Sequence, residues 1–154
     1  MTAQGPKFQR QHGLSEAEVS HGQNEFKEAT ADVLLPRQQA GVWLELCKLR
    51  KQGKIPNWKQ GLFVSDCGSS VGRLSVAKEM FPCIRPGNCY LILNDGTPGM
   101  ASGLLCMATQ GIGPGEAGAF DLHLEEDCSL RHMAGNAFCA NTCLVYLVAA
   151  LLYT

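Results

Sequence analysis

The feature that most constrains the fold is an apolar run near the end of the sequence. Residues 137 to 153, AFCANTCLVYLVAALLY, follow a Gly135-Asn136 pair and are almost continuously apolar. A membrane-spanning helix needs roughly 20 predominantly apolar residues, whereas this run has 17 and includes Asn141 and Thr142. We therefore predict a helix that is buried in a domain core or against a missing partner, because its side chains need apolar cover on most faces.

Length and composition fit one globular domain and favour no class of partner. The chain has 154 residues, of which 45% are hydrophobic, and this is enough for a sizeable core. The formal net charge is -1, so no global field attracts nucleic acid or an anionic membrane. Binding of either kind would need a local patch of charge.

The eight cysteines have three interpretations: a disulfide framework, a zinc site or reduced buried thiols. The opening residues MTAQGPKFQRQHG contain no apolar signal segment, so we expect an intracellular location, nucleus or cytoplasm, in which thiols stay reduced. No Cys-x-x-Cys pair occurs, and Cys139 and Cys143 with His132 lack the second close pair of a structural zinc site. Buried structural thiols are therefore the preferred interpretation.

Local patterns predict a helix-rich α/β or α+β fold. Residues 1 to 13 show no periodicity and are expected to form a flexible lead. A capping box at Ser15 and Glu18 predicts a short helix that stops at Gly22, and apolar spacing predicts a second helix over 36 to 53.

Further along, two strands and two helical regions are expected. GLFVS (61 to 65) and NCYLILN (88 to 94) are typical of strands. A short helix is predicted to end at Gln110-Gly111, and the region 129 to 153 is predicted to be helical apart from its Gly-Asn corner.

One candidate site is the glycine-containing stretch FVSDCGSSVGRLSVAKEMF and the strand that follows it. A strand, a turn with Asp66, Gly68 and Gly72, an expected helix and a second strand ending at Asp95 imitate half of a doubly wound nucleotide-binding fold. The glycine spacing departs from the dinucleotide fingerprint, since Ser70 stands at its middle glycine. An ordinary turn in a small domain is the alternative.

A second candidate is a local basic patch, which would contact DNA phosphates through positive charge. Its alternative is a solvated helix end, since cations also favour helix C-termini. The patch comprises Lys48, Arg50, Lys51, Lys54 and Lys59.

Two further stretches invite a functional interpretation. The Gly135-Asn136 pair permits a sharp, left-handed corner that would aim backbone N–H groups at a small ligand, although a plain interhelical turn has the same residues. Pro82-Cys83 invites a nucleophile, but only Arg85 is near to favour a thiolate, so a structural cysteine is preferred.

LRHMAGNAF followed by an apolar helix resembles motif X of the cytosine-5 DNA methyltransferases, and ASGLLCMATQGI resembles their motif IX. FPCIRPGNCYLIL is similar to the end of the family's target-recognition region. The resemblance covers about residues 62 to 153. It implies a target-recognition-like region over 14 to 94, and a motif IX and X region over 95 to 154 with a buried C-terminal helix and part of a Rossmann-like fold.

The family's motif X corner helps line the S-adenosylmethionine pocket, so the resemblance implies that Gly135, Asn136 and Ala137 contact this cofactor. Departures from the pattern are equally informative: Leu105 stands where motif IX has a glutamate, and the nucleophile loop and glycine-rich cofactor loop have no counterpart. The family transfers a methyl group to cytosine C5 in DNA. The resemblance thus implies that this chain holds no catalytic residue and cannot carry out that transfer alone. DNA and an upstream catalytic half or partner chain are the implied partners, and a membrane is not.

Two other classes of protein remain open. One is a small self-contained domain that binds S-adenosylmethionine or a nucleotide through Asp66, Gly68, Gly72 and Asp95. The other is a non-enzymatic module that interacts with DNA or protein through the basic patch or the C-terminal helix.

Overall fold

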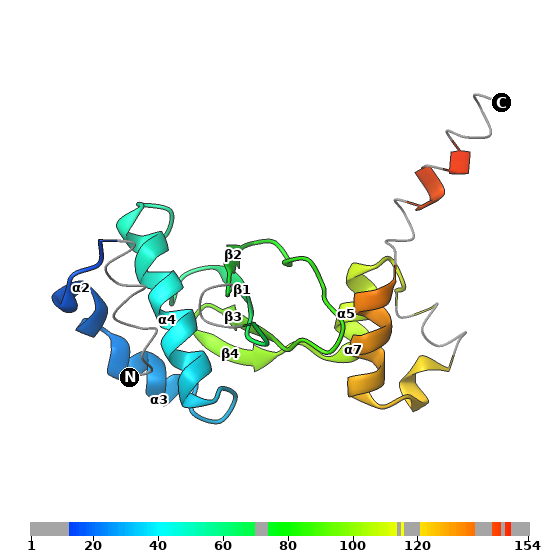
Figure 1. The fold of residues 1–154 in the computed structure, drawn as a ribbon, viewed down its shortest axis with the longest axis horizontal. Coiled ribbons are helices and arrows are strands. Elements are labelled where there is room, and N and C mark those ends of the chain that lie inside the picture. The colour runs from blue at the N-terminus through cyan, green and yellow to red at the C-terminus, as the bar shows by residue number, and fades with distance from the viewer. Residues whose placement is uncertain are drawn as a thin grey trace. The chain divides into compact units, whose positions relative to one another are not determined.

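The computed structural model describes residues 13–69, 74–113, 115, 121–137, 143–145 and 147–148. The chain divides into two compact units. Unit 1 comprises residues 1–82 and 89–100, and unit 2 comprises residues 83–88 and 101–154. Figure 1 shows the elements of both units.

Three helices open unit 1. They are α2 (Glu16–Ser20), α3 (Gln23–Ala29) and α4 (Pro36–Lys51). The predicted capping box is confirmed, because the Ser15 hydroxyl accepts a hydrogen bond from the Glu18 N–H while the Glu18 carboxylate accepts one from the Ser15 N–H. The predicted second helix is also confirmed, with Pro36 in its first turn and Gly53 in the left-handed region (φ 67°) just after its end.

The sheet of unit 1 has four strands, all paired antiparallel in the order β2-β1-β3-β4. They are β1 (Leu62–Asp66), β2 (Val76–Lys78), β3 (Tyr90–Asn94) and β4 (Thr97–Met100). The two strands predicted from the sequence are confirmed as β1 and β3. The prediction of a helix after the glycine-containing turn is wrong: residues 76–78 form a strand that pairs with β1, and buried Leu74 and partly buried Val76 lie two residues apart on one side of this segment.

The core of unit 1 lies between α4 and one face of the sheet. Phe63, Leu91 and Leu93 of the sheet belong to the same buried cluster as Val42 and Leu46 of α4. Because strand side chains alternate between faces, residues 63, 65 and 67 of the β1 segment and 89, 91 and 93 of the β3 segment point the same way.

Aromatic side chains hold the three helices together. The Phe26 ring centroid lies 5.3 Å from that of Trp43 and 5.3 Å from that of Trp58, where the rings meet edge to face. The Trp43 indole N–H donates to the Val19 carbonyl at 2.6 Å, so this buried ring also satisfies its polar atom. The α3 helix is therefore anchored by one fully buried side chain, Phe26.

Unit 2 contains α5 (Gly103–Thr109), the 3₁₀ turn η1 (Leu122–Leu124) and α7 (Asp127–Asn136). Helices α5 and α7 pack side by side (Figure 1). The Asp127 carboxylate accepts a hydrogen bond from the Gly103 N–H at the start of α5, and the Ser102 hydroxyl accepts one from the Leu105 N–H. The predicted end of the first of these helices at Gln110-Gly111 is confirmed, with Gly111 at φ 89°.

Of the C-terminal helix that was predicted to be buried in a domain core or against a missing partner, the structure describes residues 143–145 and 147–148. Leu144, Val145, Leu147 and Val148 are 46–67% exposed. Residues 143–145 and 147–148 are helical, and among the described residues these four side chains have no apolar cover. Apart from Ala137, the rest of the apolar run lies outside the described residues, as do residues 1–12 of the predicted flexible lead.

The coarse fold class is confirmed as a mixture of helices with a small antiparallel sheet. Within the described ranges, no helix has the length and apolar character needed to cross a membrane.

Candidate functional site

The corner predicted at Gly135-Asn136 lies one residue later than expected. Both residues belong to the last turn of α7, and neither has a positive φ. The chain leaves the helix at Ala137, which adopts extended backbone (φ -78°, ψ 145°) and donates its N–H to the Ala134 carbonyl at 3.4 Å. A helix C-terminus presents carbonyl oxygens, so the N–H groups of this turn do not converge on a ligand as predicted.

Gly135 is required by packing. A Cβ built there would lie 2.5 Å from Pro86 Cα and closer still to Pro86 N and the Arg85 carbonyl carbon. Real Cβ atoms essentially never approach backbone so closely, hence only glycine lets α7 lie directly against the Arg85-Pro86 backbone. Sequence reasoning missed this function because the contact spans about 50 residues of sequence.

The other two predicted cofactor residues are accessible. Asn136 is exposed and Ala137 is half-buried at the point where the chain leaves α7. The Asn136 side chain, with both donors and an acceptor, is therefore the group at this helix end that can contact a polar ligand.

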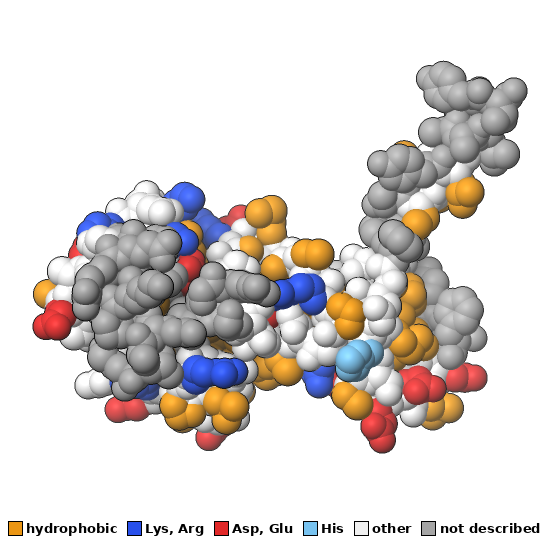
Figure 2. All heavy atoms as spheres, viewed as in Figure 1, with side chains coloured by type: hydrophobic (Ala, Val, Ile, Leu, Met, Phe, Trp, Pro, Cys, Tyr) orange, Lys and Arg blue, Asp and Glu red, His pale blue; other side chains and the backbone are white. Residues whose placement is uncertain are grey.

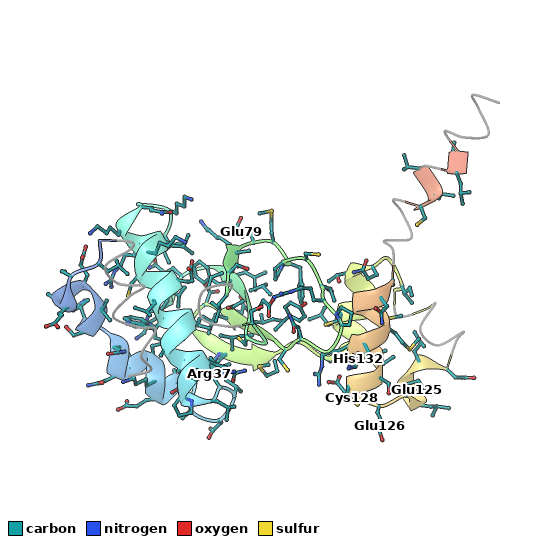
Figure 3. All side chains as sticks on the ribbon, viewed as in Figure 1. Arg37, Glu79, Glu125, Glu126, Cys128 and His132 are labelled. Atoms are coloured by element: carbon teal, nitrogen blue, oxygen red, sulfur yellow. The ribbon has the colours of Figure 1, made fainter. Side chains whose placement is uncertain are left out.

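The exposed side of α7 carries several titratable side chains, which Figure 3 labels. Cys128 and His132 lie one turn apart on the helix, and Glu125 and Glu126 precede it. Cys128 Sγ lies 3.5 Å from a Glu126 carboxylate oxygen. Within the described part of the chain, no three such groups converge as a metal site would require; Cys139, considered above with His132, lies outside it.

Most side chains of the predicted basic patch form ion pairs with glutamates or donate hydrogen bonds to backbone carbonyls. Lys48 pairs with Glu45 at 3.2 Å, and Lys51 pairs with Glu18 at 3.5 Å. Lys59 pairs with Glu25, and the Arg50 guanidinium donates to the Glu18 carbonyl at 2.7 Å, while Lys54 follows the end of α4. On the face drawn in Figure 2, acidic side chains stand among the basic ones of unit 1, which argues against a concentrated phosphate-binding surface.

Beside this patch is a shallow hollow in unit 1 of about 190 Å³, a volume that includes open solvent. It is lined by Trp43, Leu46, Cys47, Arg50, Ile55, Asn57 and Trp58. Its enclosed volume is about 10 Å³, whereas pockets for small molecules usually measure about 300–1,000 Å³, so this hollow is too small to enclose a nucleoside cofactor.

The carboxylates of the glycine-containing stretch, those of Asp66 and Asp95, accept hydrogen bonds from nearby protein groups. Asp66 is 3% exposed and accepts hydrogen bonds from the Gly68 N–H at 3.1 Å and the Ser69 hydroxyl at 3.3 Å. Asp95, in the tight β3–β4 turn with Gly96, accepts one from the Gly61 N–H at 2.8 Å. Gly72 lies outside the described residues. Because β1 and β3 are antiparallel neighbours, this stretch is not the parallel βαβ unit that a doubly wound fold requires.

Cys67 and Cys89, which lie 22 positions apart in the sequence, come together in the sheet. The Cys67 N–H donates to the Cys89 carbonyl at 2.8 Å, directly beyond the β1–β3 ladder. Cys83, the nucleophile considered above, is exposed in a segment without regular structure. None of the described cysteines, Cys67, Cys83 and Cys89 among them, is joined to another in a disulfide.

Comparison with known proteins returned no match to any protein-family model, any curated protein sequence or any solved structure.

Proposed function

We propose that this chain is the C-terminal portion of a cytosine-5 DNA methyltransferase-like protein, in which motif X contributes one edge of an S-adenosylmethionine pocket. The parent reaction would transfer the methyl group of S-adenosylmethionine to cytosine C5 in DNA. The chain is inactive alone, because the nucleophile and the main cofactor loop have no counterpart in it. An upstream catalytic half, in the same or another polypeptide, would supply them.

The observation that carries the proposal is that the segments resembling the family meet in unit 2. The motif IX-like helix α5 packs on α7, and the Gly103 N–H donates a hydrogen bond to the Asp127 carboxylate between them. Helix α7 ends in the motif X-like Gly135-Asn136. Gly135 lies against Arg85-Pro86, within the stretch similar to the end of the target-recognition region. Segments about 20 and 50 residues apart in sequence thus form one cluster, as expected if they descend from one functional module.

The exposed apolar side chains at the C-terminus support a missing partner. Leu144 and Leu147 are 59% and 62% exposed, and Figure 2 shows apolar side chains on this segment. Apolar groups of this size gain free energy when a second surface covers them, at about 25 cal/mol per Å² buried. In this proposal the covering surface is the upstream catalytic half.

Two alternatives receive less support from the contacts. A self-contained nucleotide-binding domain needs Asp66 and Asp95 to face a ligand, but Asp66 accepts a hydrogen bond within its own turn and Asp95 accepts one from the Gly61 N–H. A DNA-binding module needs an unneutralised basic surface, but Lys48, Lys51 and Lys59 pair with glutamates.

The proposal is tested by titrating S-adenosylhomocysteine into the ¹⁵N-labelled chain and following amide chemical shifts. We expect weak binding that moves the signals of Asn136 and Ala137, because only one edge of the pocket is present. Asn136→Ala should weaken that binding about tenfold, the effect of losing roughly one hydrogen bond to a polar ligand. Asn24→Ala, which changes an exposed asparagine of α3, is the matched control and should bind as the unmodified chain does.

Two results would contradict the proposal. The first is the absence of any shift at residues 135–137 at saturating ligand, or equal affinity in Asn136→Ala. The second is transfer of a labelled methyl group to DNA by the chain alone, which would mean that the catalytic groups are present after all.

A further inference from the structure

We propose that Cys67 and Cys89 form a dithiol site that is converted to a cross-strand disulfide by thiol–disulfide exchange with a low-molecular-weight disulfide such as oxidised glutathione. This modification site is independent of the methyltransferase proposal. Both cysteines belong to unit 1.

The strand register places the two cysteines directly opposite each other. In the β1–β3 ladder, Ser65 faces Leu91 and Asp66 faces Tyr90, so the next pair in the same register is Cys67 and Cys89. The hydrogen bond from the Cys67 N–H to the Cys89 carbonyl, 2.8 Å, shows that the pairing continues beyond the regular strands. Directly opposite residues of an antiparallel pair project their side chains to the same face.

The spacing of such a pair suits a disulfide. Opposite residues joined by a backbone hydrogen bond have Cα atoms about 5.5 Å apart. Disulfides span Cα distances of roughly 4.4–6.8 Å, most often 5.5–6 Å. The bond can therefore form by rotation of the two side chains, without moving the strands.

The surroundings of the two thiols differ in a way that sets the order of reaction. Cys67 is 1% exposed, its Sγ lies 3.6 Å from the Ser65 carbonyl, and burial raises its pKa to about 11. Cys89 is partly exposed. The Cys89 thiol also helps raise the pKa of Cys67, as expected for sulfur atoms that lie near each other. Oxidised glutathione can therefore reach Cys89 first, and Cys67 follows as the resolving thiol.

The chemistry has two balanced steps. The Cys89 thiolate attacks one sulfur of oxidised glutathione, which forms a mixed disulfide and releases one glutathione thiolate. The Cys67 thiolate then attacks the Cys89 sulfur, forms the Cys67–Cys89 bond and releases the second glutathione. The two cysteines together lose two protons and two electrons, and one oxidised glutathione becomes two reduced molecules.

Cys47, Cys83 and Cys128 lack this arrangement. Cys47 lies in α4 with its Sγ 3.6 Å from the Glu18 carbonyl. Cys83 and Cys128 are exposed and would form mixed disulfides with glutathione. A test must therefore separate the cross-strand bond from reaction at these exposed thiols.

The test treats the folded Cys83→Ser chain with oxidised glutathione in native buffer, blocks remaining thiols and maps the cysteines by mass spectrometry. Cleavage with trypsin and with a protease that cuts before aspartate gives peptides 66–73 and 79–94, which in this variant each hold one cysteine. We expect these two peptides to be joined, with the mass of two hydrogen atoms lost. Because only a small fraction of Cys67 is thiolate at neutral pH, and this fraction rises tenfold per pH unit below its pKa, joining should become about tenfold faster per pH unit between about pH 7 and 9.

Two matched variants complete the test. In Cys67→Ser,Cys83→Ser, Cys89 should stop at the glutathione adduct; in Cys83→Ser,Cys89→Ser, Cys67 should stay reduced in the folded chain. The proposal is overturned if peptide 66–73 stays reduced while Cys89 accumulates as the adduct in the Cys83→Ser chain. It is equally overturned if the two peptides are joined only in the presence of urea, because the bond would then need an unfolded chain.

Discussion

The close approach of α7 to the Arg85-Pro86 backbone makes Gly135→Ala a sharp test of unit 2. An alanine Cβ would lie 2.5 Å from Pro86 Cα, where ordinary van der Waals contact begins at 3.4 Å. The atoms that it meets belong to the backbone and cannot rotate away. The helix would therefore have to retreat by roughly 1 Å or distort.

The magnitude follows from two opposing effects. Alanine favours a helix interior over glycine by about 1 kcal/mol, and this is an upper bound on the gain in the last turn of α7. Overpacking against rigid neighbours costs about 3 kcal/mol at the upper end of its usual range, because α7 also loses contacts of buried Leu130 and Ala134 when it retreats. We expect a net loss of about 2 kcal/mol in the free energy of local unfolding of α7.

Amide hydrogen exchange with mass spectrometry measures this locally, on peptides that cover residues 121–137. A loss of about 2 kcal/mol corresponds to exchange about 30-fold faster in α7. Gly99→Ala is the control, since no heavy atom lies within 4 Å of a Cβ at Gly99 in β4, and α7 should then exchange as in the unmodified chain. Equal or slower exchange of α7 in Gly135→Ala would refute the backbone contact, because only the helix preference of alanine would remain.

Two further predictions concern unit 1. Thr30→Val should lower the free energy of unfolding, measured by urea titration, by about 1–2 kcal/mol. The fully buried Thr30 hydroxyl donates to the Phe26 carbonyl at 2.7 Å and accepts from the Gln39 amide at 3.1 Å, and valine removes both bonds. An unchanged unfolding midpoint would mean that these bonds contribute nothing net. Burial raises the pKa of Cys47 and Cys67 from 9.0 to about 11, so the unfolded chain releases these protons first, and stability in reducing buffer should fall as the pH rises from about 9 to 11. Replacing both cysteines with alanine should make that fall shallower, and an equally steep fall would assign it to other groups.

The sequence predicted those elements of the fold whose signals are local. The Ser15–Glu18 capping box and the apolar spacing after Pro36 are each complete within a few residues, and both helices formed. Helix α3 was missed because Phe26 is its one buried side chain, which is too little for a periodic pattern. Strand β4 was missed because Thr97–Met100 contains Pro98 and Gly99, which are tolerated there because β4 lies at the edge of the sheet.

The candidate site depends on contacts between distant segments, which one sequence does not show. Gly135 was interpreted as a corner, since glycine favours turns, but its neighbour in space is the backbone of Pro86. Asp66 was interpreted as a ligand-binding residue, but its carboxylate is satisfied by the turn that it starts. The pairing of Cys67 with Cys89 could have been found from the sequence only by predicting the register of β1 and β3.

The path of the chain through the two units has a consequence for folding. Residues 83–88 belong to unit 2, yet both of their flanks, up to residue 82 and over 89–100, belong to unit 1. No single cut yields an intact unit 2: a fragment starting at residue 101 lacks the Arg85-Pro86 backbone that Gly135 contacts, and one ending at residue 100 leaves that backbone without α7. The Arg85-Pro86 backbone therefore stays without its neighbour in unit 2 until α7, which follows β3 and β4 in the chain, packs against it.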